Sequence, residues 1–216
     1  RVDNYYWLND RENPEVITYL EAENAYTETV MSPTKAFQEE LFEEMKGRIE
    51  YVTLSPGEPV QVGSATVTPC LLNHPVVDFG YRIDCNGKSV FFTGDHEPPY
   101  NIYDPQDEGY AAYQSLVDEK NRAIVEAIRG VDVLIADTSY TAEEYPAKKG
   151  WGHGTFATSI ELAQQAGVQV LFCTHHEPTR SDDALESAFA KALSQRGAPQ
   201  QGLDIRLARE GDTYEF

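Results

Sequence analysis

The first fifty residues carry apolar positions with a helical period. In "NPEVITYLEAENAYTETV" and "PTKAFQEELFEEMKGRI" the apolar residues recur at spacings of three and four, which is typical of amphipathic helices. Asn13-Pro14 and Ser32-Pro33 are suitable helix starts, and Gly47 lies near a helix end. The pattern therefore predicts two helices before residue 50, in a segment that contains no histidine.

After residue 50 the pattern changes to short β-rich runs. "TVTPCLL", "FGYRIDC" and "SVFFTGD" predict strands, and Asn86-Gly87 between the last two is a strong hairpin signal. Helices and strands are then expected to alternate. A helix over about 110–129 is followed by the strand "VDVLIAD", the helix "TFATSIELAQQAG" closed by Gly167, and the strand "VQVLFCT". The helix "DDALESAFAKALSQRG" comes next, and a strand pair in "LDIRLAREGDTYEF", turned at Gly211-Asp212, ends the chain. This order predicts an α/β fold over residues 51–216, preceded by a helical segment over residues 1–50.

Composition narrows the range of partners. The chain has 216 residues, 41% of them hydrophobic, which is enough for one sizeable core. Its 17 Lys and Arg against 36 Asp and Glu give a net charge of −19, which repels nucleic-acid backbones and anionic membranes. No apolar run approaches the roughly 20 residues of a membrane span. Cys70, Cys85 and Cys173 are odd in number and widely spaced, so we expect reduced thiols and a cytoplasmic location.

Polar side chains follow four of the predicted strands. His74 lies beyond "TVTPCLL", Asp95 beyond "SVFFTG", Asp137 at the end of "VDVLIA" and His175 beyond "VQVLFCT". In open α/β sheets the ligand crevice lies at the carboxyl ends of the strands, so we expect these groups to converge. Imidazoles with a carboxylate are usual ligands of Zn²⁺, Mn²⁺ or Fe²⁺, which favours hydrolysis by metal-activated water. The alternative for each residue alone is a surface group or a helix cap.

Five sequence blocks carry a resemblance to a known superfamily. They are "LNHPVVDFGYRI", "VFFTGDHEP", "VDVLIADTSYTAEEY", "GWGHGTFATSIELAQQAGV" and "VLFCTHHEPTRSDD". In their order and spacing, residues 51–216 resemble the C-terminal half of a metallo-β-lactamase-fold hydrolase, above all its phosphodiesterase-type branches. The resemblance implies half of an αββα sandwich, with β-rich hairpins and then alternating helices and strands. It also implies one or two divalent ions, Zn or Mn, acting on a phosphodiester or an ester.

The same resemblance implies roles for individual residues. His74 would ligate one metal ion, Asp95 would bridge two ions and also serve catalysis, and His175 would ligate the second ion. His153 would face the substrate phosphate as a proton donor or charge stabiliser. The alternative is that His153 or Thr155 merely caps the helix that begins near residue 156.

Three further residues are expected to support the site. His96 and His176 each follow a predicted ligand, and neighbours in an extended segment point to opposite faces, so we expect them to orient ligands or to lie in the core. Asp137 is expected to support the site as well, or to hold the loop that runs to Trp151.

The chain lacks the first half of the superfamily's sequence pattern. The chain contains no H-x-H, so the H-x-H-x-D-H ligand loop of the superfamily is absent, and metal binding is expected to be weak and mononuclear. Residues 1–49, with "YYWL" and "EAEN", instead resemble the N-terminus of oligopeptidase B in the prolyl oligopeptidase family. There is no G-x-S-x-G nucleophile motif, so no peptidase activity is expected. A natural fusion, an assembly artefact and a designed chimera all fit the junction near Glu50.

Three function classes follow from these observations. The first is a metal-dependent hydrolase of a small phosphodiester or ester, with no long nucleic acid and no membrane as partner. The second is a catalytically inactive interaction module, and the third is a peptidase-related fragment without activity. Half of a sandwich leaves an apolar sheet face open, so we expect homo-oligomers or poor solubility.

Overall fold

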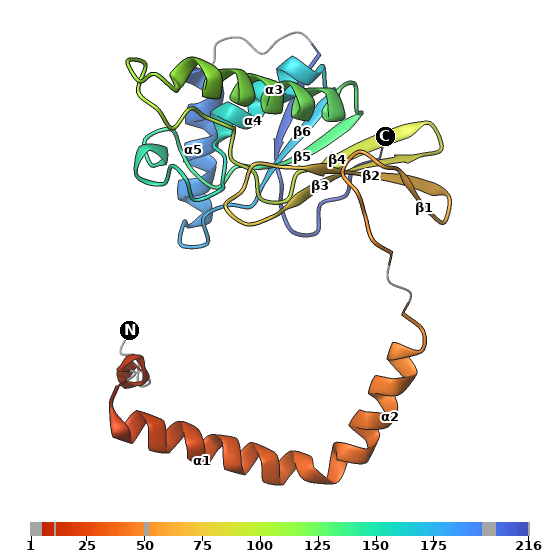
Figure 1. Ribbon diagram of the computed structural model, residues 1–216, viewed down its shortest axis with the longest axis vertical. Helices are drawn as coiled ribbons and strands as arrows, with labels where there is room; N and C mark the ends of the chain where they lie inside the picture. The colour runs from red at the N-terminus through yellow and green to blue at the C-terminus, as the bar shows by residue number, and fades with distance from the viewer. Residues whose placement is uncertain (1–5, 11, 50–51, 196–201, 216) are drawn as a thin grey trace. The chain divides into compact units, whose positions relative to one another are not determined.

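The first part of the chain is helical. The computed structural model describes residues 6–10, 12–49, 52–195 and 202–215, and divides into compact units over 1–53 and 54–216 (Figure 1). The first unit contains a 3₁₀ helix (η1, Tyr6–Asn9), α1 (Pro14–Met31), a second 3₁₀ turn (η2, Ser32–Thr34) and α2 (Lys35–Lys46). Asn13 caps α1 by accepting a hydrogen bond from the Glu15 amide at 2.9 Å. Both predicted helices are confirmed, and their apolar side chains are largely exposed.

The second unit is built on one mixed sheet of seven strands, whose spatial order is the sequence order. The strands are β1 (Val60–Val62), β2 (Ala65–Leu71), β3 (Phe79–Cys85), β4 (Lys88–Phe92), β5 (Val133–Asp137), β6 (Val170–Thr174) and β7 (Asp204–Leu207). Neighbours from β1 to β4 pair antiparallel, and neighbours from β4 to β7 pair parallel. The predicted β3–β4 hairpin is confirmed: Asn86 and Gly87 form its turn with φ values of 52° and 77°, the conformation that a two-residue hairpin requires.

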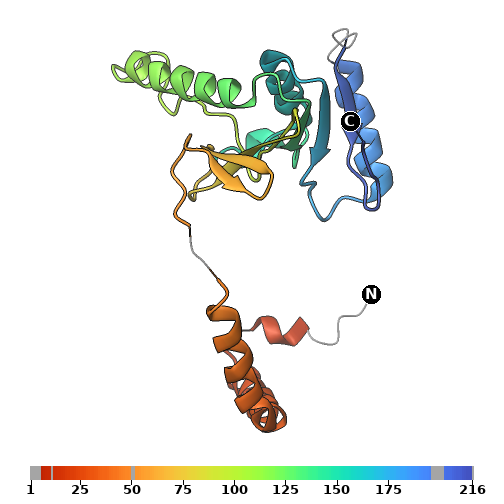
Figure 2. The same ribbon diagram turned by 90° about the vertical axis from the view of Figure 1, so that its right-hand side faces the viewer.

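Three helices lie on one face of this sheet (Figures 1 and 2). They are α3 (Tyr110–Ile128), α4 (Phe156–Ala166) and α5 (Asp182–Gln195), and α4 contacts both of the other helices. The residues paired across the central strands on this face, Phe91, Leu134 and Leu171, are each 0% exposed and form the core with the helices. This layer of helices over a mixed sheet confirms the predicted α/β class.

Close packing under the helices depends on one glycine. A Cβ at Gly80 would lie 2.7 Å from Cε1 of Phe91, closer than real Cβ contacts allow. Only glycine therefore lets strand β3 pass beneath the Phe91 ring.

The opposite face of the sheet is also apolar. One row of apolar residues on it runs across five strands in register: Pro69, Tyr81, Phe92, Ile135 and Phe172. Phe92 is 44% exposed, whereas its neighbour Phe91 on the helix face is fully buried. Within the second unit the helices leave this face open, as expected for half of a sandwich.

Two details differ from the sequence prediction. The expected strand pair at the C-terminus is wrong, because β7 pairs only with β6 and the described residues 208–215 form no strand. Tyr214 instead packs its ring 5.6 Å from that of Phe172, so side-chain contacts hold this segment. The short strand β1 was not predicted. No helix among the described residues is long and apolar enough to cross a membrane.

Cys70, Cys85 and Cys173 are free thiols, as expected. Burial raises the pKa of Cys173 to about 12, so this thiol stays protonated at neutral pH.

The two faces of the sheet predict a contrast between adjacent residues. Phe91→Ala should lower the free energy of unfolding by about 3–5 kcal/mol, because it empties a packed core site. Phe92→Ala, one residue along on the open face, should cost less than about 1 kcal/mol. Urea titration followed by circular dichroism measures both variants. An equal loss for Phe92→Ala would mean that another surface covers this face.

Candidate metal centre

The carboxyl ends of four strands meet at one edge of the sheet. Because β2 and β4 are each antiparallel to β3, they run in the same direction, and β5 and β6 are parallel to β4. His74, Asp95, Asp137 and His175 follow or end these strands, so the sheet directs all of them to the same edge. The predicted convergence of these residues is therefore present in the fold.

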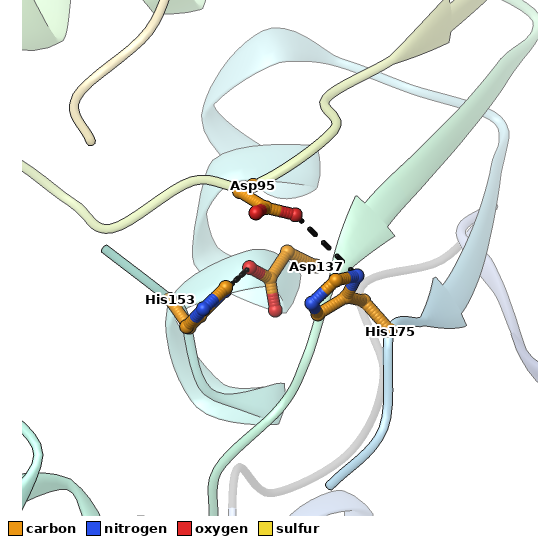
Figure 3. A group of neighbouring side chains, drawn as sticks. All are labelled: Asp95, Asp137, His153 and His175. Carbon is orange, nitrogen blue, oxygen red and sulfur yellow. Dashed lines mark hydrogen bonds and ion pairs between the residues drawn. The ribbon is translucent and has the colours of Figure 1, made fainter. Parts of the chain in front are cut away.

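Four side chains form the centre of this cluster (Figure 3). Asp95, Asp137, His153 and His175 each offer one ligand atom, and these atoms lie within 4.8 Å of one another. His74 lies beside them, with its Nε2 atom 3.8 Å from Oδ2 of Asp95. The structure thus gathers every residue to which the sequence gave a ligand or catalytic role, while the roles themselves stay predictions.

Asp95 lies between two imidazoles. Its Oδ1 atom is 3.4 Å from Nδ1 of His175, and its Oδ2 atom faces His74. The backbone amide of Asp95 donates to Asp78 at 2.9 Å, which fixes the turn after β4. One carboxylate oxygen therefore faces each histidine, the arrangement that a shared ligand requires.

Asp137 is a buried carboxylate whose hydrogen bonds are all made within the protein. Oδ1 accepts from the Ser139 amide at 3.0 Å and the Ser139 hydroxyl at 2.8 Å. Oδ2 accepts from the His96 amide at 3.2 Å and from Nδ1 of His153 at 2.8 Å. Since a carboxylate offers about four acceptor positions, these bonds use the group fully. The geometry favours the supporting role expected for Asp137 over direct metal ligation.

His153 is held by this carboxylate. Its Nδ1–H donates to Asp137, so the ring is fixed in orientation and Nε2 stays available for a proton, a metal ion or a substrate. The ring stacks on that of His175 with centroids 4.9 Å apart. The alternative role of helix cap belongs to Thr155, which forms a reciprocal capping box with Thr158 at the start of α4.

His175 has an unusual backbone. Its φ of 55° lies in the left-handed region, which costs energy for any residue other than glycine. The Ser139 hydroxyl lies 2.6 Å from the His175 carbonyl and shares its single proton between this carbonyl and Oδ1 of Asp137, which helps to hold this conformation. Strain at a position that faces Asp95 is typical of a functional site.

Glu97 is a structural member of the site that sequence reasoning missed. It is 1% exposed, and its carboxylate accepts from the Tyr145 hydroxyl at 2.6 Å, the Gly150 amide at 2.9 Å and the Gly152 amide at 3.0 Å. Burial, followed by this hydrogen bond, raises the pKa of Tyr145. Glu97 therefore fixes the loop over residues 145–152, which leads directly to His153. The sequence signal that could have identified Glu97 as a member of the site is its position two residues after Asp95.

The loop lies closely against His74. A Cβ at Gly152 would lie 2.0 Å from Cδ2 of His74, and Gly152 has a φ of 94°. Only glycine fits at this position, both for space and for backbone conformation. The loop that Glu97 fixes therefore also limits the position of His74.

His96 and His176 lie outside the cluster. His96 is 7% exposed, and burial lowers its pKa to about 4, so the ring is neutral at pH 7. The His176 ring lies 6.0 Å from that of Phe156, with Nδ1 3.4 Å from the Thr138 hydroxyl. In the described part of the chain, Nδ1 of His96 and Nε2 of His176 have no hydrogen-bond partner. The supporting or core roles expected for both residues stay predictions.

The donor set fits a divalent cation. The imidazoles of His74 and His175 and the carboxylate of Asp95 are the ligand types that Zn²⁺ and Mn²⁺ accept, and His153 offers a ligand atom to the same cluster.

Metal content should depend on this cluster. Protein purified without chelator should carry about one equivalent of Zn or Mn, and Asp95→Ala and His175→Ala should lose most of it, because each removes a ligand at an already incomplete site. His176→Gln is the control and should keep the metal. Elemental analysis measures the content. If Asp95→Ala and His175→Ala both kept the metal, the metal would not be bound at this cluster.

Removal of the Glu97 carboxylate should loosen the segment over residues 145–153, which we call the histidine loop. Glu97→Gln leaves at least one buried donor unpaired, which costs about 1–3 kcal/mol in stability. Hydrogen exchange over residues 145–153 should accelerate in this variant, and Glu108→Gln, an exposed acid before α3, should change neither quantity. Unchanged exchange in Glu97→Gln would show that the loop is held by other contacts.

Comparison with known proteins divides the chain near the boundary between the two compact units. Residues 1–65 match the family described as "Prolyl oligopeptidase, N-terminal beta-propeller domain". Dipeptidyl aminopeptidase BI of Pseudoxanthomonas mexicana is 52% identical over 52 residues, which are 23% of this chain and 7% of that protein. This confirms the resemblance of the N-terminal segment to the prolyl oligopeptidase family.

The remainder of the chain is similar to other proteins. Uncharacterized protein Rv1339 of Mycobacterium tuberculosis is 32% identical over 136 residues, 62% of this chain and 41% of that protein. Ribonuclease Z of Agathobacter rectalis is 32% identical over 100 residues, 45% of this chain and 33% of that protein. The chain thus spans less than half the length of the curated relatives it matches.

A solved structure identifies the fold. The metallo-beta-lactamase fold protein YhfI of Bacillus subtilis superposes with a TM-score of 0.54 at 20% identity, covering 80% of this chain and 61% of that one. The predicted resemblance is confirmed at the level of the fold. The chain therefore combines part of a metallo-β-lactamase fold with an N-terminal segment of the prolyl oligopeptidase type.

Proposed function

We propose that the second unit is a divalent-metal-dependent hydrolase of small phosphodiesters. The observation that carries this proposal is the placement of Asp95 between His74 and His175, beside a His153 ring that Asp137 holds in one orientation. The first three residues would hold Zn²⁺ or Mn²⁺. A bound ion of this kind supplies the Lewis acidity that makes water a nucleophile at neutral pH.

The protein groups then account for the remaining chemistry. Water adds to phosphorus, one phosphorus–oxygen ester bond breaks, and the leaving oxygen needs a proton. His153 can deliver that proton from Nε2, because Asp137 accepts from Nδ1 and holds the ring in one orientation. Glu97 keeps His153 in place by fixing the preceding loop.

Local charge supports a phosphate ester over a neutral ester. In a chain of net charge −19, Lys148 and Lys149 lie within the histidine loop. The Lys148 ammonium lies 3.9 Å from the centroid of the Trp151 ring and 5.8 Å from that of Tyr140, whose ring contacts His153. These cations favour an anionic substrate near the cluster. The similarity to a protein named ribonuclease Z agrees with phosphodiester chemistry. The free cysteines agree with a cytoplasmic setting.

One observation favours a second candidate. Since the chain has no H-x-H-x-D-H loop, its described ligands are fewer than a two-metal centre uses, and an inactive interaction module is the alternative. Such a module would use the open sheet face around Phe92 to bind another surface, a second copy of the chain included. A peptidase-related function has no support, since the sequence lacks a nucleophile motif.

Hydrolysis of diphenyl phosphate with Zn²⁺ or Mn²⁺, followed by release of phenol, tests the proposal, because the phenolate leaving group is basic enough to need a proton. We expect His153→Ala to lower kcat by about 100-fold or more, as for loss of a general acid, while metal content stays unchanged. A chelator should abolish the activity of the unmodified chain. Loss of metal together with turnover in His153→Ala would make His153 a ligand instead of a proton donor. Bound metal without turnover in the unmodified chain would favour the inactive module.

A further inference from the structure

A cleft leads away from the candidate metal centre along α3. It has a volume of about 340 Å³ and begins at His74, one of the proposed ligands. Its walls include Pro75, Pro99, Tyr100, Ile102, Tyr113 and Leu116; we refer to it as the α3 cleft. The volume falls within the range of small-molecule sites, roughly 300–1,000 Å³.

The walls of the α3 cleft are flat and apolar. Two prolines and two tyrosines present rigid faces, and such surfaces suit planar rings. Ile102 is 64% exposed and Leu116 is 54% exposed, although the chain as a whole is highly charged. Exposed apolar side chains that gather at a cleft beside a reactive centre mark a ligand site.

Positive charge borders the same cleft. Lys120 is part of the lining, and the Lys149 ammonium lies 4.0 Å from the centroid of the Tyr100 ring. Glu97 also lines the cleft, but its carboxylate accepts hydrogen bonds from Tyr145, Gly150 and Gly152, which reduces its repulsion of an anion. The α3 cleft therefore suits a ring attached to a negatively charged group.

The position of the cleft decides which part of a substrate it holds. His74 lines it, whereas His153, the proposed donor to the leaving oxygen, does not. The ring centroids of these two histidines are 5.8 Å apart. The leaving group therefore belongs on the His153 side, and the ester arm that stays on phosphorus belongs on the His74 side.

We propose that the α3 cleft binds the retained arm of the phosphodiester substrate and that this arm carries a planar ring. This inference rests on the hydrolase function proposed above. It names a specificity site formed mainly by residues 99–102 and the first half of α3, with Gly150 of the histidine loop also in the lining.

Two substrates with one leaving group test the inference. Phenyl 4-nitrophenyl phosphate and methyl 4-nitrophenyl phosphate both release 4-nitrophenolate and differ only in the retained arm. We expect kcat/KM to be at least about tenfold higher for the phenyl ester, the usual gain from filling an apolar pocket. Leu116→Trp fills the cleft and should bring this ratio close to one.

Ser115→Trp is the matched control. It places the same side chain one residue away on the exposed surface of α3, outside the cleft, and should keep the ratio of the unmodified chain. Ile102→Trp is a second blocking variant on a different segment of the wall, in case Leu116→Trp fails to fold. Equal kcat/KM values for the two esters in the unmodified chain, or a ratio that neither blocking variant changes, would overturn the inference.

Binding separates this inference from the proposed function. If neither diester is hydrolysed, the proposed function fails, and the cleft is then tested by titrating phenylphosphonate and methylphosphonate into the metal-loaded chain by calorimetry. Binding of phenylphosphonate at least about tenfold tighter than methylphosphonate, with the difference lost in Leu116→Trp and kept in Ser115→Trp, would support the cleft. Equal affinity for the two phosphonates would overturn it.

Discussion

The buried carboxylate of Asp137 connects the parts of the candidate site. It lies at the end of β5 and accepts hydrogen bonds from the turn after Asp95, from the histidine loop and from Ser139. The Ser139 hydroxyl shares its single proton between this carboxylate and the His175 carbonyl, and so links Asp137 to His175. A buried carboxylate is tolerated only when its hydrogen bonds are satisfied, so its environment forces three separate segments into fixed positions around it.

Glu97 repeats this principle on the other side of the histidine loop. Both carboxylates are almost fully buried in a chain that already carries a large negative charge. Burial of such groups is unfavourable for stability unless donors surround them, and here the donors come mainly from loop backbone and from residues near the metal cluster. Burial of these carboxylates lowers the stability of the fold and makes the loop rigid. A rigid loop is a requirement of active sites and not of loops that only connect elements.

The sheet presents a second physical constraint. One face is covered by α3, α4 and α5, and the other presents an apolar row through Tyr81, Phe92 and Ile135. An apolar face of this length is stable when something covers it, which is why a sandwich needs two sheets. The candidate site lies at the edge of this sheet, so a surface that covers the face is also well placed to add groups to the site.

Local patterns in the sequence were sufficient for most elements and for the approximate position of the site. The Asn86-Gly87 hairpin, the α4 helix closed by Gly167 and the strand-end positions of His74, Asp95 and His175 follow from periodicity and turn chemistry, which depend on neighbouring residues. The C-terminal strand pair failed because strand pairing depends on a partner elsewhere in the chain, and Tyr214 found a side-chain contact instead.

Only the tertiary structure decided how the polar groups pair. Thr155, and not His153, caps α4; Asp137 holds His153; and Glu97 binds a loop about fifty residues away in sequence. A buried hydrogen bond is chosen by whichever donor the fold brings within about 3 Å, a long-range property that residue spacing does not contain. The sequence by itself therefore determined which residues form the candidate site and at which edge of the sheet they lie, and the packing of distant segments decided their orientation.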